Sequence, residues 1–359
     1  MARRGEIYMR SRRRGRQESS AVGITVLVWL ILLAAGVPAS RAADDPPPVS
    51  RDSRLQVELF AADPDIVTPT GLDVDHAGRV FAIESNTHFP PEGYSRHGSD
   101  RVLVLQDIDG DGAAERPKVF ADGFVHAMSI AVRTSFESQV PDTVLVATRK
   151  EVVALWDDDG DLVADRRRRI LHLDTPGNYP HNGLAGFAFD AQGFMYIGLG
   201  ENLGADYKLI GSDKVTWAGG GEGGSIFRCR LDGTKLVRFA TGFWNPHANC
   251  VDTFGRIFSV DNDPDSLPPC RLIHIVQGGD YGYRFRNGRK GFHPFTSWNG
   301  EIPGTLPMMA GTGEAPSGIV AYESDGLPSE YIGNLLVTSW GDHRIDRFRL
   351  VEKGAAFES

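Results

Sequence analysis

Cysteine is scarce in this sequence and occurs in no recognisable motif. Only three cysteines are present among 359 residues, at Cys229, Cys250 and Cys270, and no two of them have C-x-x-C spacing. The C-x-x-C-H motif that attaches a c-type haem is absent as well. Each cysteine lies in or beside an expected strand, so we expect these thiols to be buried as small apolar side chains.

The chain also lacks the excess of basic residues that nucleic-acid binding requires. It carries 38 lysines and arginines against 47 aspartates and glutamates, a formal net charge of −9. Eight of the arginines lie between Arg3 and Arg41, so the chain that follows them is more acidic still. Nucleic-acid binding needs a basic surface that displaces counterions, so this acidity argues against such a partner and suits an exported protein that binds cations.

Only one long hydrophobic run is present, and it lies near the N-terminus. Ala21–Val37 carries no charge, follows the arginine-rich stretch and precedes the small residues of Pro38–Ala42. This order is typical of a signal peptide, and the run is at the short end for a membrane-spanning helix. We predict a signal peptide over residues 1–42, with a retained membrane anchor as the alternative, and hence an exported protein, periplasmic or extracellular. Residues 43–53 are predicted to be a proline-rich linker.

Long helical periodicities are few, whereas glycine is abundant at 42 residues, which indicates an all-β fold rich in turns. One pattern recurs: an apolar residue, Asp, two residues, Gly, two more residues and an aromatic. Its copies are Val74–Phe81, Phe189–Tyr196 and Val251–Phe258. Each copy predicts two strands joined by a tight turn, and an alternating strand follows it. A four-stranded unit that repeats every ~40–50 residues predicts the blades of a β-propeller.

Five such units can be counted, at about residues 66–116, 124–170, 181–236, 243–287 and 314–350. The predicted fold is therefore all-β: a propeller over residues 54–350, of the six-bladed type, with about five four-stranded blades present. Residues 351–359 are expected to be a truncated tail, which implies that a final blade is missing.

The antiparallel order of the strands predicts which loops share a face. Loops that enter the innermost strand and loops that leave the second strand open on one face, and the other turns open on the opposite face. His126, His181 and His247 precede innermost strands, so we expect them on the same face around the propeller axis.

Two acidic turns are predicted on the opposite face. In "DIDGDGAAE" and "DDDGDLVAD", carboxylates alternate around a turn that glycine permits. Alternate carboxylates can surround a hard cation such as Ca²⁺. The alternative is a solvated acidic turn without a metal, but the recurrence at the same position of two units favours structural calcium sites. The candidate ligands are Asp107, Asp109, Asp111, Glu115, Asp157, Asp159, Asp161 and Asp165.

Several stretches, in order, resemble a known family: His181–Gly183, Gly223–Thr234, Thr241–Ser266, Gly278–Phe285 and Gly333–Leu350. From His181 onward the chain resembles the soluble PQQ-dependent glucose/sorbosone dehydrogenases, which are six-bladed propellers. Over nearly all of residues 54–350 it is similar to the membrane-bound dehydrogenase propeller domain of large secreted bacterial proteins. The resemblance implies oxidation of a sugar or another alcohol, with electrons passing through a quinone to a c-type haem partner.

The resemblance also implies roles for individual residues. His181 matches a histidine that acts as general base, and a neutral imidazole suits this work near neutral pH. Asn245 matches an asparagine that contacts the quinone, and the backbone at Asp263 and Pro264 matches carbonyls that hold the cofactor-bound Ca²⁺. An arginine of the family is replaced here by Trp244, and a lysine by Gly341.

Without these two cations, an anionic quinone would lose charge-assisted hydrogen bonds worth about 1.5–3 kcal/mol each. We expect Arg284, Arg286 and Arg344 to supply replacement charge. Trp244 is expected either to stack on the cofactor or a sugar, or to be wedged between blades.

Two other functions remain open. One is a non-catalytic, calcium-stabilised propeller that binds carbohydrate or protein. The other is a metal-dependent propeller lactonase, with a metal held by residues such as Glu84, Asn202 and Asp261.

Overall fold

The chain folds into short antiparallel strands because its recurrent hairpin pattern fixes tight turns. The computed structural model describes residues 48–359 apart from 91, 95, 136–139, 266 and 355, and the predicted signal peptide lies outside this range. In the first copy of the pattern the Asp75 carboxylate accepts the amides of Ala77 and Arg79, both at 2.9 Å. Gly78 has a φ of 81°, a conformation that glycine adopts without strain. The same Asp-to-amide contacts recur at Asp190 and Asp252.

The strands form five blades, which confirms the predicted all-β propeller. Blade 1 contains β1 (Pro69–Val74), β2 (Val80–Glu84), β3 (Asp100–Leu105) and β4 (Lys118–Phe124). Blade 2 contains β5 (Ala127–Arg133), β6 (Thr143–Thr148), β7 (Glu151–Trp156) and β8 (Arg166–Asp174). Blade 3 contains β9 (Leu184–Phe189), β10 (Phe194–Leu199), β13 (Gly224–Arg230) and β14 (Val237–Phe243).

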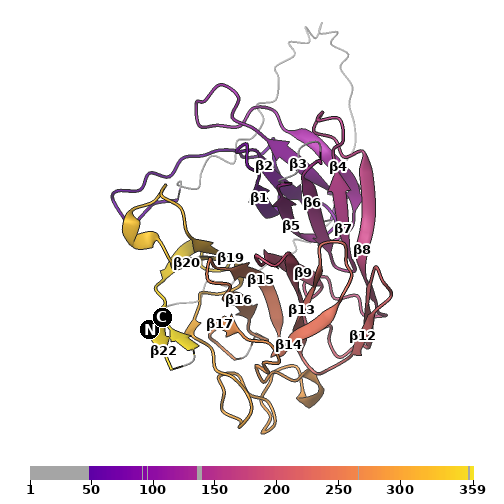
Figure 1. Cartoon of the computed structure of the whole chain (residues 1–359), viewed down its shortest axis with the longest axis vertical. Helices are drawn as coiled ribbons and strands as arrows, with labels where there is room; N and C mark the ends of the chain where they lie inside the picture. Colours follow the sequence, from indigo (N-terminus) through magenta and orange to yellow (C-terminus); the bar gives the residue numbers. More distant parts are fainter. Residues whose placement is uncertain (1–47, 91, 95, 136–139, 266, 355) are drawn as a thin grey trace, which may run out of the picture. The chain divides into compact units, whose positions relative to one another are not determined.

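Blade 4 contains β15 (Asn245–Val251), β16 (Ile257–Asn262), β17 (Arg271–Ile275) and the short β18 (Ala310–Gly311). Blade 5 has three strands, β19 (Pro316–Tyr322), β20 (Asn334–Ser339) and β21 (Arg344–Phe348). Short 3-10 helices lie at η1 (Phe285–Asn287) and η2 (Ser329–Tyr331). Figure 1 shows the blades following one another in chain order, from indigo to yellow.

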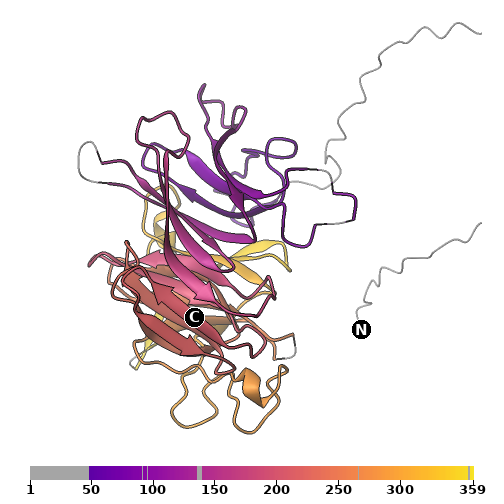
Figure 2. The same ribbon diagram turned by 90° about the vertical axis from the view of Figure 1, so that its right-hand side faces the viewer.

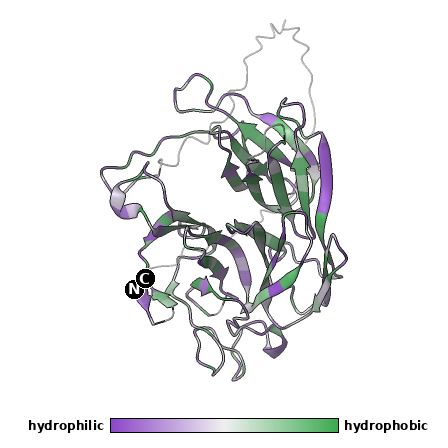
Figure 3. Cartoon of the chain, in the orientation of Figure 1, coloured by the Kyte–Doolittle hydropathy of each residue, from purple (hydrophilic) through white to green (hydrophobic). Residues whose placement is uncertain are grey.

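The innermost strands lie side by side in the order β1, β5, β9, β15 and β19, so consecutive blades pack face to face. Hydrophobic side chains from adjacent blades fill each interface. One buried cluster includes Phe81 of blade 1 and Val153 of blade 2, and another includes Val260 of blade 4 and Val337 of blade 5. Complete burial of such a side chain stabilises the fold by about 1.5–3 kcal/mol. Figure 3 shows hydrophobic residues concentrated in the strands, while the outer strand β8 carries a hydrophilic stretch.

Two hairpins lie outside the four-stranded pattern. The hairpin of β11 (Tyr207–Gly211) and β12 (Thr216–Gly219) belongs to blade 3 by sequence, but β11 pairs with β8 of blade 2. Residues 351–359, expected to be a tail, contain the hairpin of β22 (Val351–Lys353) and β23 (Ala356–Glu358). Phe357 of this hairpin contacts the ring of Phe258 in blade 4, with a centroid distance of 6.0 Å.

A segment before β1 connects the last blade to the first. The Tyr331 hydroxyl donates to the Asp52 carboxylate at 3.1 Å, and Arg54 lies 2.5 Å from Glu330. Farther along, the Phe60 carbonyl accepts the amide of Ala114 at 2.8 Å. This segment therefore contacts both blade 5 and blade 1. Among the described residues, none forms a helix of the length and apolarity needed to cross a membrane.

The strand order defines two faces of the propeller. Loops that enter an innermost strand or leave a second strand open on one face, here named the histidine face. The turns between the first and second and between the third and fourth strands open on the other, here named the acidic face. In the view of Figure 2 the long connections around residues 280–310 extend beyond the sheets.

Candidate active site

A buried carboxylate positions the first two histidine-bearing segments of the histidine face. Asp100 is fully buried, and it accepts the amides of Asn86 and Thr87 at 2.6 and 2.7 Å. Its other oxygen accepts the amide of Ala127 at 2.7 Å, and the Thr87 hydroxyl accepts the amide of His126 at 2.7 Å. Asp100 therefore joins the loop after β2, which carries His88, to the start of β5.

These contacts bring imidazoles from different blades together. Nε2 of His88 lies 3.1 Å from Nδ1 of His181, and their ring centroids are 4.5 Å apart. The ring of His126 lies 6.0 Å from that of His88. Phe89 and Tyr179 pack against the His181 ring, at centroid distances of 5.3 and 5.2 Å. His181 is thus held among other rings at the histidine face, as the topology predicted.

A second buried carboxylate fixes the backbone of His181. Asp261 accepts the amides of Trp244 and Asn245 at 3.1 and 2.6 Å. The side-chain amide of Asn245 then donates to the carbonyl of His181 at 3.2 Å. Asn245 therefore lies beside the candidate base.

Three histidines of this site, His88, His181 and His247, have lowered pKa values, which favours their neutral form. Burial, followed by the neighbouring His181 and His126, lowers the pKa of His88 to about 4. Burial also lowers the pKa of His181, although the nearby Asp265 opposes this shift, and it lowers the pKa of the His247 ring. Near neutral pH each ring can accept a proton or bind an electrophile through a nitrogen lone pair.

The other three predicted cofactor contacts, Trp244, Arg284 and Arg344, are each held by partners other than His181. Trp244 is only 4% exposed and packs against Tyr283, with ring centroids 5.4 Å apart, so the structure places its ring in the core between blades. Arg344 lies on the histidine face, but it is exposed and ion-paired with Asp346 at 2.8 Å.

Arg284 forms an ion pair with Asp280 and donates to the Glu222 carbonyl at 3.1 Å. It lines a pocket of about 480 Å³ together with Arg238, Arg286 and other residues of blades 3 and 4. His181 is not part of this lining.

A buried cation that sequence reasoning missed lies next to the His181 loop. Arg149 is 3% exposed and donates to the Tyr179 carbonyl at 2.7 Å and to the Asn202 side chain at 2.5 Å. Its Nη1 is buried and has no hydrogen-bond partner, and burial lowers the pKa of this guanidinium. Among the described residues no carboxylate forms an ion pair with it, so the site contains a positive charge that an anionic group would stabilise.

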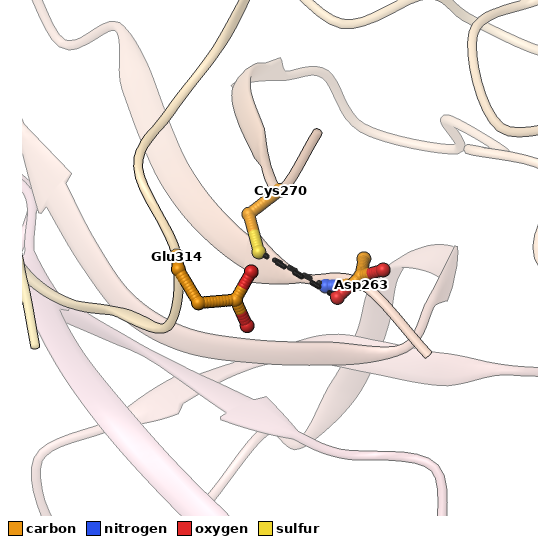
Figure 4. Close-up of side chains that lie close together, drawn as sticks. All are labelled: Asp263, Cys270 and Glu314. Atoms are coloured by element: carbon orange, nitrogen blue, oxygen red, sulfur yellow. Dashed lines mark hydrogen bonds between the residues drawn. The ribbon is translucent and has the colours of Figure 1, made fainter. Parts of the chain in front are cut away.

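Asp263 belongs to a small group of candidate metal ligands where blade 4 meets blade 5. Ligand atoms of Asp263, Cys270 and Glu314 lie within 4.8 Å of one another (Figure 4). The Cys270 sulfur accepts the Asp263 amide at 3.3 Å, and burial raises the pKa of this thiol to about 12, so it stays protonated. Burial and nearby carboxylates, led by Asp263, raise the pKa of Glu314. Pro264 follows Asp263 and is buried in the same loop.

The two acidic turns connect β3 to β4 and β7 to β8, and therefore open on the acidic face. In each turn the structure brings three of the four predicted ligands together within 4.8 Å. Asp111 and Asp161 are outside these groups and instead accept the amides of Ala113 and Val163. The grouped ligands are Asp107, Asp109 and Glu115 in the first turn and Asp157, Asp159 and Asp165 in the second.

The residues considered for a lactonase metal are each held by a different arginine. Glu84 lies 3.0 Å from Arg101, and the fully buried Asp261 lies 2.5 Å from Arg271. Asn202 accepts from Arg149, as described above. These contacts occupy the oxygen atoms that a metal would need.

His88 could have been found from the sequence, because it follows the second strand of blade 1 by only a few residues. Its loop was therefore expected on the same face as His181. Arg149 gave no such signal, since nothing in the sequence distinguishes a buried turn arginine from an exposed one.

Comparison with known proteins gives a family and a fold. The family model described as "Domain of unknown function (DUF7133)" matches residues 49–359. No curated protein sequence matches the chain.

Solved structures of sugar dehydrogenases share the propeller. The chain is similar to the PQQ-bound form of aldose sugar dehydrogenase from Streptomyces coelicolor, with a TM-score of 0.52 and 18% identity over 80% of this chain and 78% of that one. It is similar to an oxidoreductase of Thermus thermophilus described as a glucose dehydrogenase, with a TM-score of 0.56 and 16% identity over 82% of each chain. It is also similar to the PQQ domain of pyranose dehydrogenase from Coprinopsis cinerea, with a TM-score of 0.51 and 12% identity over 81% and 77%. The resemblance predicted from the sequence is thereby confirmed for the fold.

Proposed function

We propose that this chain, which belongs to the DUF7133 family, is a propeller oxidoreductase that oxidises a sugar or another alcohol. The observation that carries the proposal is the position of His181. Its neutral ring lies at the histidine face, its backbone is fixed by Asn245, and a hydrogen bond joins it to His88. Its proposed role is that of a general base for a substrate hydroxyl.

The contact with His88 determines which nitrogen of His181 can act. A hydrogen bond between Nε2 of His88 and Nδ1 of His181 needs one proton between the two rings. When that proton is on Nδ1 of His181, Nε2 of His181 carries a lone pair and can accept the hydroxyl proton. Once Nε2 is protonated, the positive charge of His181 is stabilised by the acceptor nitrogen of His88.

Two residues beside His181 could hold an anionic quinone. Asn245 could contact such a cofactor, and Arg149, with its unpartnered Nη1, could offset the charge of a carboxylate. When bound, PQQ would supply the hydride acceptor for the oxidation. Neither Arg284 nor Arg344 is proposed as a cofactor contact, because both are ion-paired with aspartates.

The proposal also includes bound calcium, export of the protein and an electron acceptor. Asp263 and Glu314 concentrate negative charge on the histidine face and are proposed to bind Ca²⁺ there, while the two acidic turns bind structural Ca²⁺. The N-terminal segment is proposed to direct export to the periplasm or the cell exterior, and a c-type haem protein is the proposed electron acceptor.

The proposal is tested with the full chain supplied with PQQ and Ca²⁺, a panel of sugars and alcohols, and an artificial electron-accepting dye. We expect dye reduction that depends on PQQ, and a loss of about 100-fold or more in kcat/KM for His181→Ala. His76→Ala is the control, because His76 is an exposed histidine on the acidic face.

Two other outcomes would overturn it. Glycan binding without dye reduction would indicate a non-catalytic propeller. Metal-dependent lactone hydrolysis that needs no dye would indicate a lactonase.

A further inference from the structure

Four imidazoles lie on the histidine face, and each comes from a different blade. His88 and His126 belong to blades 1 and 2, and His181 and His247 to blades 3 and 4. Only the His88–His181 pair is in direct hydrogen-bond contact. The ring of His126 approaches His88, and His247 interacts electrostatically with both His88 and His181.

The spacing within the central pair is that of two ligands on one metal ion. In a tetrahedral complex with metal–nitrogen distances of about 2.0–2.1 Å, neighbouring ligand nitrogens lie about 3.3 Å apart. The two nitrogens of His88 and His181 are 3.1 Å apart. An ion could therefore replace the shared proton with only a small outward movement of the rings.

The surroundings of the four rings differ from those of His76 and His97, two exposed histidines elsewhere in the described chain. His76 and His97 lie 3.3 and 3.9 Å from carboxylate oxygens of Asp142 and Asp122. None of the four clustered imidazoles has such an ion-pair partner among the described residues. His247 interacts with the Ser317 backbone, while its Nδ1 is buried without a partner. A buried nitrogen lone pair of this kind is an available ligand atom.

We propose that this histidine cluster binds one late first-row transition-metal ion, with His88 and His181 as the first two ligands. His126 and His247 complete the coordination by turning their rings toward the ion. Zinc, copper, iron and nickel accept imidazole nitrogen, whereas calcium prefers carboxylate and carbonyl oxygen. The cluster is therefore chemically distinct from the acidic groups described above.

This site goes beyond the proposed oxidation and restricts it. A His181 ring that binds an ion through Nδ1 keeps its proton on Nε2, so it cannot accept a proton from a substrate. The ion-bound protein is therefore inactive as a dehydrogenase, and the metal is an inhibitor of the proposed reaction. Binding itself does not depend on PQQ or on turnover, so it can be measured even if the chain oxidises nothing.

The test is a calorimetric titration of the full chain with Zn²⁺ and, separately, Cu²⁺, in excess Ca²⁺ that saturates the acidic groups. We expect one ion per chain. We also expect the Cu²⁺ electron paramagnetic resonance spectrum to show splitting from imidazole nitrogens. His88→Ala and His181→Ala should each weaken binding about 10- to 100-fold, and the double variant should abolish it. His126→Ala should weaken binding less, because its ring lies farther away.

The matched control is His76→Ala, which should leave affinity and stoichiometry unchanged. Circular dichroism and thermal unfolding of each variant separate a lost ligand from a lost fold, which matters most for His247 within β15. Unchanged binding in the His88→Ala/His181→Ala double variant would overturn the proposal, as would a Cu²⁺ spectrum without nitrogen splitting. If the unmodified chain binds one ion at the cluster but reduces no dye, the proposed oxidation fails and the metal site stands.

Discussion

The carboxylate of Asp261 and the guanidinium of Arg271 lie 2.5 Å apart, and both side chains are completely buried. Arg271 also donates to the carbonyls of Tyr281 and Trp298 at 2.8 and 2.9 Å, and it stacks on the Trp298 ring. On its other side, Asp261 holds the amide of Asn245. This pair therefore connects the core of blade 4 to the segment that fixes His181.

Breaking this pair should destabilise the whole fold. Asp261→Asn leaves the Arg271 charge buried without a counter-ion, which should lower the free energy of unfolding by about 3–5 kcal/mol. Urea unfolding followed by circular dichroism measures the change. Arg344→Gln, which breaks an exposed ion pair, is the control and should change stability by less than about 1 kcal/mol. Equal effects of the two substitutions would contradict the role given to the buried pair.

Stability should fall as the pH is lowered from 6.5 toward 4, in part because of His88. The pKa of this ring is about 4 in the folded protein and 6.5 in the unfolded chain. Between these values the unfolded state binds a proton that the folded state does not, so acid favours unfolding. Allowing for partial solvent exposure, the contribution should be on the order of 1–2 kcal/mol.

The contribution of His88 is measured as the difference in stability between the original chain and His88→Gln, because the other titrating groups are common to both proteins. Urea unfolding at a series of pH values should show a shallower loss of stability in the variant. Parallel curves would contradict the pKa shift assigned to His88.

Trp244→Ala should lower the stability of the fold rather than weaken ligand binding directly. The indole is 4% exposed and packed against Tyr283 and Trp298, so its removal leaves a cavity. We expect a loss of about 3–5 kcal/mol in the free energy of unfolding. A variant of unchanged stability with weaker ligand binding would instead place the ring at the ligand.

The three thiols should resist alkylation while the protein is folded. Burial raises the pKa of both Cys229 and Cys270 to about 12, and it also raises that of Cys250, so no thiolate forms near neutral pH. Mass spectrometry after iodoacetamide treatment should find no labelled cysteine in the native chain and three in the denatured chain. Rapid native labelling of Cys270 would show that the loop at Asp263 opens.

Calcium removal should lower the thermal midpoint of unfolding. Each acidic turn places three carboxylate ligands within 4.8 Å, where an ion would offset their repulsion. Chelation with EDTA should lower the midpoint, and added Ca²⁺ should restore it. Asp107→Asn combined with Asp157→Asn should remove most of this difference, which scanning calorimetry measures. A midpoint insensitive to both treatments would indicate solvated turns without metal.

The sequence predicted those parts of the fold that local residues determine. Each copy of the hairpin pattern became a strand pair, because its Asp accepts two nearby amides and its Gly adopts a positive φ. The alternation of strands then placed His126 and His181 before innermost strands on one face. His247, expected to precede its innermost strand as well, instead lies within β15, near the end of the strand at that face. The five blades and the two faces followed from these local rules.

Other features depend on contacts between distant residues and could not be predicted. Trp244 lies beside Asn245 in sequence, but the packing of Tyr283 and Trp298 decides that its ring enters the core. The pairing of β11 with β8 likewise depends on the path of the long connection between β10 and β13 of blade 3. The charge of Arg149 is buried by Tyr179 and Asn202, which lie 30 and 53 residues later.

The hairpin that leaves blade 3 and pairs with β8 has a consequence for how the propeller opens. Backbone hydrogen bonds between β8 and β11 join blade 2 to blade 3 at their outer edge, while side chains alone fill most of the space between their sheets. The two blades should therefore behave as one cooperative unit in amide hydrogen exchange. Blade 5, with three strands and an exposed outer strand β21, should exchange its amide protons first.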